Sequence, residues 1–314
     1  MDTYTNPLNI QKIGDPYVLK ALDGRYYCYP TSDGKAGFKV WRSDNLVDWT
    51  DLGHIYKATD KSWGHNRFWA PEVVIFEGRY YMYYTAGWKE NNSLRIGVAV
   101  SDKPEGPFED VYDRPMFDFG YAVLDANILF DDDGKKYMYY SMDCSENMRD
   151  GVPESHIYGI ELSGDILSVK GEPVLLAMPE QAWERKSKER FWNEGPFVLK
   201  HNGLYYLMYS ANCYADRTYG VGYALSDKPL GKFVKYEHNP VLSSSDSVSG
   251  PGHHSVVSVG DEMFMVYHTH TDPAAGGGDR QVCIDRMGFD ADGNIWVKGP
   301  TDTPQPRLRA EGKG

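Results

Sequence analysis

Three acidic residues stand at the same spacing from a repeated turn sequence. Asp15, Asp125 and Glu194 each lie nine residues before a glycine of that turn, and each begins a short apolar segment. Two carboxyls that face each other across a pocket can cleave a glycosidic bond, because one donates a proton and the other activates a water or attacks the sugar. A third carboxylate nearby opposes ionisation of the acid. The pattern therefore predicts acid–base chemistry at one shared site.

The three acids differ in reach. Glu194 is favoured as the proton donor, because its longer side chain can reach an exocyclic oxygen. Asp15 and Asp125 would then be the base and its helper, and the spacing does not order those two. Each acid taken alone has an ordinary structural explanation, since Asp before Pro commonly starts a turn. Three acids in one register are harder to explain structurally, so a catalytic role is favoured.

The turn sequence belongs to a repeat of the whole chain. It reads DGRYYCYP, EGRYYMYY, DGKKYMYY, NGLYYLMY and GDEMFMVY, with turn glycines at Gly24, Gly78, Gly134, Gly203 and Gly260. A repeat of this period indicates one supersecondary unit per copy. Each copy shows an apolar segment, a glycine turn of the kind that hairpins need, an aromatic strand, a third strand and a closing aromatic segment. We therefore predict an all-β fold, a five-bladed β-propeller with four antiparallel strands per blade, as a single domain over residues 1–314.

The first strand of each blade would line the central channel of such a fold. Nine residues before the second turn glycine stands Trp69; before the fifth it is Pro251, with His253 two residues further on the same strand face. The five inner strands would then offer Asp, Trp, Asp, Glu and His to one pocket. We expect His253, rather than His268 and His270, to face this channel, because the latter two lie one strand further out.

Other residues leave alternatives open. His268 and His270 share a strand face, so a zinc site there is a second possibility. Arg280 follows a glycine-rich loop, and it would clamp a sugar hydroxyl or a carboxylate, or only pair with Asp279 or Asp285. Residues 178–192 read as a loop or short helix at the rim of the ligand face.

Composition excludes several classes of partner. The formal net charge of -12 argues against binding to nucleic acid or to an anionic membrane. No apolar run is long enough to span a bilayer. The four cysteines match no metal-binding spacing and are expected to be buried hydrophobic residues. No signal peptide is visible, so the expected location is cytoplasmic if Met1 is native, and periplasmic or secreted if the start is processed.

The motifs resemble those of glycoside hydrolase family 43, the five-bladed propeller group of arabinofuranosidases, xylosidases and arabinanases. The matching segments are GDPYVLK, FWAPEVVIFEGRYYMYY, LDANILFDDDGKKYMYY, NEGPFVLKHNGLYYLMYSA, VGYALSDKPLG and GPGHHSVV. The resemblance implies single-displacement, inverting hydrolysis. Asp15 would be the general base, Asp125 the residue that modulates the pKa of the acid, and Glu194 the general acid. It also implies that Trp69 walls the sugar pocket and that Arg280 contacts substrate.

The resemblance implies no required cofactor, and it leaves room for a structural Ca²⁺ ion held by His253 on the axis. The expected substrate is an arabinose- or xylose-containing oligosaccharide or polysaccharide of plant cell walls. An exo-acting α-L-arabinofuranosidase is the first choice, partly because Asp125 is followed by Ala126 rather than by proline. A β-xylosidase is the second choice and an endo-α-1,5-arabinanase the third. A non-catalytic carbohydrate-binding propeller is the alternative of another class.

Overall fold

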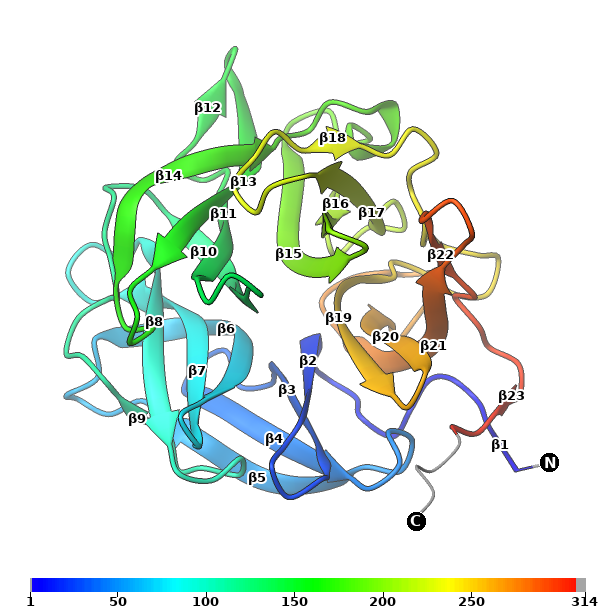
Figure 1. Cartoon of the computed structure of the whole chain (residues 1–314), viewed down its shortest axis with the longest axis horizontal. Coiled ribbons are helices and arrows are strands. Elements are labelled where there is room, and N and C mark those ends of the chain that lie inside the picture. Colours follow the sequence, from blue (N-terminus) through cyan, green and yellow to red (C-terminus); the bar gives the residue numbers. More distant parts are fainter. Residues whose placement is uncertain (1, 309–314) are drawn as a thin grey trace.

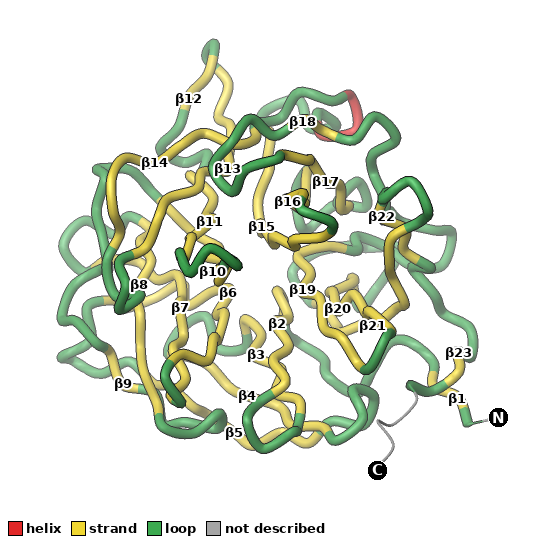
Figure 2. The backbone as a smooth tube through the Cα atoms, in the orientation of Figure 1, coloured by secondary structure: helices red, strands yellow, loops and turns green. Residues whose placement is uncertain are grey.

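The computed structural model of this protein describes residues 2–308 and is built almost wholly of β-strands. The helical content of those residues is one short 3-10 turn, η1 (Ala182–Glu184), drawn red in Figure 2. It lies in the 178–192 segment, as expected. In the same residues, no helix has the length and apolar character needed to cross a membrane. The prediction of an all-β fold is confirmed.

Twenty strands fall into five successive units, one for each sequence repeat. Unit 1 comprises β2 (Gly14–Lys20), β3 (Tyr26–Thr31), β4 (Gly37–Ser43) and β5 (Thr50–Lys57). Unit 2 comprises β6 (Gly64–Phe76), β7 (Arg79–Trp88), β8 (Leu94–Ser101) and β9 (Glu109–Asp110). Unit 3 comprises β10 (Val123–Phe130), β11 (Lys136–Met142), β13 (Val152–Leu162) and β14 (Val169–Ala177). Unit 4 comprises β15 (Phe191–His201), β16 (Leu204–Ala211), β17 (Gly220–Ser226) and β18 (Val234–Lys235). Unit 5 comprises β19 (Gly252–Val259), β20 (Glu262–His270), β21 (Arg280–Phe289) and β22 (Ile295–Val297).

The first two strands of every unit form the hairpin that the repeat predicts. All five turn glycines have left-handed φ angles, between 57° and 82°, a region that glycine enters without steric cost. The turns differ in width, however. Residues 21–25 and 131–135 form wide loops in units 1 and 3, whereas the other three hairpins turn through two residues.

The five first strands surround a common centre (Figure 1). β2 contacts β6 and β19, β10 contacts β6 and β15, and β15 contacts β19. The remaining strands of each unit lie progressively further out. One feature departs from four purely antiparallel strands per unit. β13 extends past the strand beside it, so Glu154 and Ser155 pair in parallel with Phe191 and Trp192 of β15. This pairing joins units 3 and 4 into one nine-stranded sheet, which also includes the short β12 (Met148–Arg149).

A bulge interrupts each first strand close to the centre. The register with the second strand shifts by one residue there, and the first bulged residue has a left-handed backbone with φ between 43° and 59°. These five residues are Asp15, Ala70, Asp125, Gly195 and His253. A bulge bends the strand and redirects its side chains, so the five equivalent positions present their residues toward the centre.

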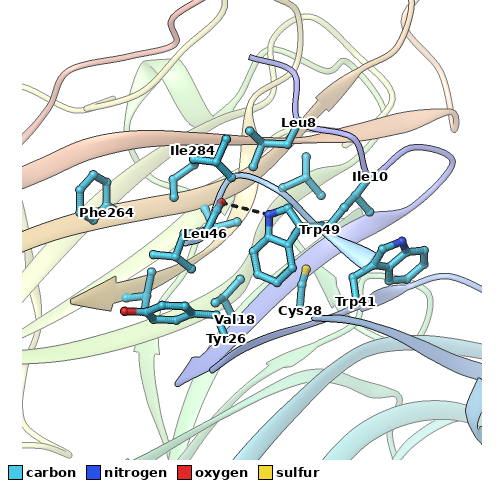
Figure 3. Close-up of a cluster of buried hydrophobic side chains, with 14 of the residues drawn as sticks. Leu8, Ile10, Val18, Tyr26, Cys28, Trp41, Leu46, Trp49, Phe264 and Ile284 are labelled. Carbon is cyan, nitrogen blue, oxygen red and sulfur yellow. Dashed lines mark hydrogen bonds between the residues drawn. The ribbon is translucent and has the colours of Figure 1, made fainter. Parts of the chain in front are cut away.

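The N-terminal segment closes the arrangement between units 1 and 5. Its backbone bonds to β21, with Leu8 donating to Val282 and Ile10 accepting from Val282. Near the chain ends, β1 (Thr3–Tyr4) pairs with β23 (Gln305–Pro306). Figure 3 shows the core cluster beneath this segment, where the Trp49 indole donates to the carbonyl of Leu46 at 3.0 Å.

Candidate active site

A pocket of about 270 Å³ opens at the bulges of the first strands. Seven of its lining residues come from those strands or their bulges: Asp15, Trp69, Leu124, Asp125, Trp192, Glu194 and His253. The other five come from loops and from the start of β21: Asp143, Cys144, Arg190, Tyr214 and Arg280. The three acids named from the sequence therefore line one cavity, as do Trp69, His253 and Arg280.

The three acids do not share one structural address, and the sequence register is wrong for Glu194. Asp15 and Asp125 are the first bulged residues of their strands, whereas Glu194 precedes the bulge residue Gly195. The miscount arises from the turns. In units 1 and 3 the hairpin loop is wider than in unit 4. The residue nine positions before the turn glycine therefore lies at a different point of the first strand in unit 4. Glu194 is equivalent to Trp69, which also directly precedes its bulge.

Asp15 lies among hydrogen-bond donors and positive charge. Its Oδ1 accepts from Arg280 Nη1 at 2.8 Å and lies 3.2 Å from His253 Nδ1, while its Oδ2 accepts from the Thr31 hydroxyl at 2.6 Å. Burial raises the pKa of the Asp15 carboxyl. Arg280, His253 and the Thr31 hydrogen bond lower it by more, so the pKa lies well below its ordinary value. Asp15 is therefore held as a carboxylate.

The path of Arg280 to Asp15 depends on the residue before the bulge. A Cβ added to Gly14 would lie 2.1 Å from the Arg280 guanidinium carbon, so only glycine leaves room for the side chain. The guanidinium also lies 4.6 Å from the centre of the Tyr214 ring, a favourable cation–π distance. Of the alternatives left open by the sequence, Arg280 thus clamps a carboxylate, and its partner is Asp15 rather than Asp279 or Asp285.

Glu194 has the opposite environment. Burial raises the pKa of its carboxyl, and the charges of Asp15 and Asp143 raise it further. A hydrogen bond from the Tyr219 hydroxyl to Oε1, 2.8 Å long, and the more distant Arg280 lower it by less. The net pKa is well above the ordinary value, so Glu194 retains its proton near neutral pH.

Asp125 is tied to the strand that carries Glu194. Its Oδ2 accepts from the backbone N–H of Gly195 at 3.1 Å. Burial raises the pKa of Asp125, and the charges of Glu194 and Asp15 add to that effect, while His253 and the Gly195 amide oppose it. Because the charge of Glu194 raises the pKa of Asp125, the two buried carboxyls do not readily ionise together.

The bulges are linked from unit to unit by one recurring hydrogen bond. In four units the bulge N–H donates to a second-strand side chain of the preceding unit: Asp15 to His268, Ala70 to Thr31, Asp125 to Thr85, and His253 to Ser210. Unit 4 is the exception, since Gly195 donates to Asp125. The equivalent Ser141 hydroxyl is buried and has no hydrogen-bond partner within residues 2–308. In unit 4 the Asp125 carboxylate, rather than that hydroxyl, accepts the hydrogen bond from the bulge N–H.

The histidines lie partly as predicted. His253 lines the pocket beside Asp15, as expected, and the neighbouring His254 is buried against Phe197. His268 does not line the pocket, as expected, but it lies directly behind Asp15. Its Nδ1 accepts from the Asp15 backbone at 3.1 Å, because the second strand lies directly behind the bulge. His270 instead supports the pocket wall by bonding the carbonyl of Tyr214 at 2.8 Å.

The groups around the histidines decide whether a metal ion could bind there. Within residues 2–308, no three His, Cys, Asp or Glu side chains gather in a way that could hold a metal ion. Nδ1 of His268 and both nitrogens of His270 already have protein partners. Calcium needs six to eight oxygen ligands, and His253 lies against the single carboxylate of Asp15. The described residues therefore do not fit a zinc site at the His268–His270 pair, and a calcium ion at His253, which would take most of its ligands from water, stays a prediction.

Several residues of the pocket were missed in the sequence. Asp143 and Cys144 follow β11, Tyr214 follows β16, and Arg190 and Trp192 come from the end of the 178–192 segment. They lie outside the repeated phrase, so no register pointed to them.

All four cysteines are unpaired, and three are buried, as predicted.

The segment that carries Arg190 and Trp192 is anchored by a buried ion pair. Glu184 is fully buried and bonds the Lys235 ammonium, which also donates to the Asn193 side chain at 2.9 Å. Asn193 directly precedes Glu194. The same contacts therefore hold one wall of the pocket and the strand position of the acid.

Comparisons with known proteins agree with one another. The model of glycosyl hydrolases family 43 matches residues 4–295. The sequence is similar to a β-D-galactofuranosidase of Aspergillus niger, with 31% identity over 309 residues that cover 92% of this chain and 83% of that protein. It is also similar to a xylosidase/arabinosidase of Bacteroides ovatus, with 27% identity over 320 residues that cover 90% and 94% of the two chains.

A solved structure gives the same result. The crystal structure of a thermostable family-43 glycoside hydrolase superposes with a TM-score of 0.94 at 50% identity, over 98% of this chain and 99% of that one.

Proposed function

This chain belongs to glycosyl hydrolases family 43 and is a glycoside hydrolase, and on that premise we propose that it is an inverting, exo-acting α-L-arabinofuranosidase. We further propose that the five units are the blades of a single-domain, five-bladed β-propeller with the pocket at one mouth of its axis. The ring of contacts among the first strands supports this architecture.

One observation carries the proposed mechanism. Two carboxyls of the same pocket have pKa values displaced in opposite directions, with Asp15 held ionised and Glu194 held protonated. Pairs of titratable groups whose environments separate their pKa values are typical of acid–base assignments in enzymes. We assign Asp15 as general base, Glu194 as general acid and Asp125 as the neighbour that modulates the acid.

The reaction proceeds in one displacement. Asp15 removes a proton from a water, whose oxygen forms a bond to the anomeric carbon. The glycosidic C–O bond breaks, and its electron pair stays on the leaving oxygen, which takes the proton of Glu194. Asp15 ends protonated and Glu194 ionised, so the proton count balances through solvent. An inverting enzyme needs room for that water, so we expect the two carboxyls to lie about 6.5–9.5 Å apart.

Trp69 and Arg280 are assigned to substrate. The Trp69 indole lines the pocket at the position equivalent to Glu194, where its apolar face suits a sugar ring. Arg280 lines the pocket beside the base, so it is placed to contact a sugar hydroxyl while it holds Asp15 ionised.

The size of the pocket supports action on chain ends. Its volume of about 270 Å³ lies below the roughly 300–1,000 Å³ of sites for drug-sized ligands, which suits one terminal sugar. The names of the two relatives support a furanose or pentose in that place, since one is a galactofuranosidase and the other a xylosidase/arabinosidase. A β-xylosidase is the second candidate on the same ground.

Hydrolysis of three 4-nitrophenyl glycosides tests the sugar. We expect the α-L-arabinofuranoside to give the highest kcat/KM, above the β-D-xylopyranoside and the β-D-galactofuranoside. A higher value for either of the others would replace the proposed substrate. Product analysis on branched arabinan tests the mode of action: release of free arabinose from the start of the reaction supports exo action, and early oligosaccharides would contradict it.

A further inference from the structure

A buried phenol holds one oxygen of Glu194. Tyr219 precedes β17 and is fully buried, and its hydroxyl donates to Glu194 Oε1 at 2.8 Å. Its ring stacks on the His268 imidazole, with centres 5.6 Å apart and planes within 4°. On another side, a Cβ added to Gly252 would lie 2.2 Å from a ring carbon of Tyr219. Packing on these sides fixes the position of the phenol.

The phenol has a second polar neighbour besides Glu194. The Ser210 side chain lowers the pKa of the Tyr219 hydroxyl, and its Oγ accepts from the backbone N–H of His253 at 2.8 Å. A phenol has one proton, and the Tyr219 hydroxyl donates it to Glu194.

The phenol also remains a donor across the working pH range. Burial raises the pKa of Tyr219 well above its ordinary value, and the charge of Glu194 raises it further, so the hydroxyl does not ionise. The Oε1 atom of Glu194 consequently always faces a donor, whether the carboxyl is protonated or ionised.

We propose that Tyr219 is a positioning residue that fixes which oxygen of the acid carries the catalytic proton. With Oε1 occupied as an acceptor, the proton of Glu194 is confined to Oε2. After the proton has left, the same hydroxyl stabilises the carboxylate that forms. This inference rests on the proposed role of Glu194 as the acid, and it adds a residue of the fourth unit that contacts no reacting atom.

The test is Tyr219→Phe, which removes the hydroxyl and keeps the ring. The carboxylate of Glu194 loses its donor, so the pKa of the acid rises and the alkaline limb of the kcat/KM profile moves to higher pH. For an arabino-oligosaccharide, whose leaving group needs the proton, we expect kcat to fall about tenfold or more, a part of the about 10²–10⁴-fold that positioned proton transfer contributes. For the 4-nitrophenyl arabinofuranoside, kcat should fall less.

A matched control is Tyr29→Phe. Tyr29 of the first unit is equally buried, and its hydroxyl donates at 2.8 Å to the carbonyl of Pro104; neither residue lines the pocket. This variant should keep the wild-type pH profile. Ser210→Ala provides a second variant: it removes the side chain that lowers the pKa of the phenol, so Tyr219 becomes a weaker donor and the alkaline limb should move in the same direction by a smaller amount.

An unchanged alkaline limb in Tyr219→Phe, or an equal loss on both substrates, would overturn the inference and leave Tyr219 a packing residue. Failure of the underlying function has a separate signature. It would appear in the otherwise wild-type protein as absent glycosidase activity, or in Glu194→Gln as a loss that does not depend on the leaving group.

Discussion

Asp15 and Glu194 carry the same functional group in one pocket, and their neighbours separate their behaviour. Asp15 accepts from Arg280 and Thr31 and lies beside His253. Glu194 accepts from the Tyr219 hydroxyl and faces the negative charges of Asp15 and Asp143. Burial opposes ionisation of both groups, so the local donors decide which one is charged.

Substitution of the acid should depend on the leaving group. Glu194→Gln cannot donate a proton, so kcat on arabino-oligosaccharides should fall by about 10²–10⁴-fold, while the 4-nitrophenyl glycoside should lose far less. Asp15→Asn should lose activity on both substrates, because each needs an activated water. Steady-state rates with both substrates give the measurement, and a uniform loss for Glu194→Gln would remove it from the acid role.

Arg280 should control the acidic limb of the pH profile. It is the largest influence that lowers the pKa of Asp15, so Arg280→Gln should raise that pKa by about 1–3 units. The base must be ionised to act, and the acidic limb of kcat/KM should therefore move to higher pH by the same amount.

Arg286→Gln is the control for that experiment. Arg286 lies on the same strand and pairs with Glu262 away from the pocket, so its loss should leave the limb in place. An acidic limb that stays at the wild-type pH in Arg280→Gln would show that Asp15 does not depend on this ion pair.

Only some of the site residues could be predicted from the sequence. Asp15, Asp125 and Glu194 were found because they precede apolar strands of the repeat. Tyr219, Asp143 and His268 come from loops and second strands, where aromatic and polar residues recur in every unit. Nothing in their local sequence separates a residue that touches the acids from one that only packs.

At the scale of elements, the bulges position the site. Each first strand bends at a residue with left-handed φ, and the bulge residues of three units are Asp15, Asp125 and His253. The five hairpins were predictable, since glycine turns and aromatic strands carry strong local preferences. The bulges were not, because the five bulge residues belong to four different residue types. The parallel pairing of Glu154 with Phe191 could not be predicted from the sequence either, because it joins the ends of two irregular segments.

Gly14, on the strand that carries the proposed base Asp15, has no room for a side chain. Gly14→Ala would place a Cβ 2.1 Å from the Arg280 guanidinium, so the arginine must move away from Asp15. We expect kcat/KM to fall about tenfold or more, with the acidic limb moved to higher pH as in Arg280→Gln.

Gly164→Ala is the matched control, because a Cβ there meets no atom within 4 Å and should leave both kcat/KM and the limb unchanged. Wild-type kinetics in Gly14→Ala would contradict the close approach of the arginine.

At the scale of the whole molecule, buried carboxyls near the axis should make stability depend on pH. Glu72 lies on β6 and accepts from Asn127 and from the amide of Ile128. Burial raises its pKa from 4.5 to about 8, although these hydrogen bonds lower it. The folded protein then keeps a proton that the unfolded chain releases, so the free energy of unfolding should fall as the pH rises from about 4.5 to 8.

The size of this effect follows from about 1.4 kcal/mol for each unit of pKa shift, which gives a few kcal/mol for Glu72. Glu72→Gln removes the titration and should flatten the pH dependence of the free energy of unfolding, measured by denaturant titration at several pH values. Glu77→Gln, at an exposed residue of the adjoining turn, should not. An identical slope in Glu72→Gln and the original protein would show that Glu72 is ionised in the folded state.

The proposed mechanism requires an ionised Asp15 and a protonated Glu194 to act together in a single displacement. Proton NMR of the first sugar released from a 4-nitrophenyl α-L-arabinofuranoside tests it most directly, before the anomers equilibrate. The proposed mechanism predicts β-L-arabinofuranose, with inverted configuration, as the initial product. Initial release of the α-anomer, with retained configuration, would contradict it and indicate a covalent intermediate on one of the two carboxylates.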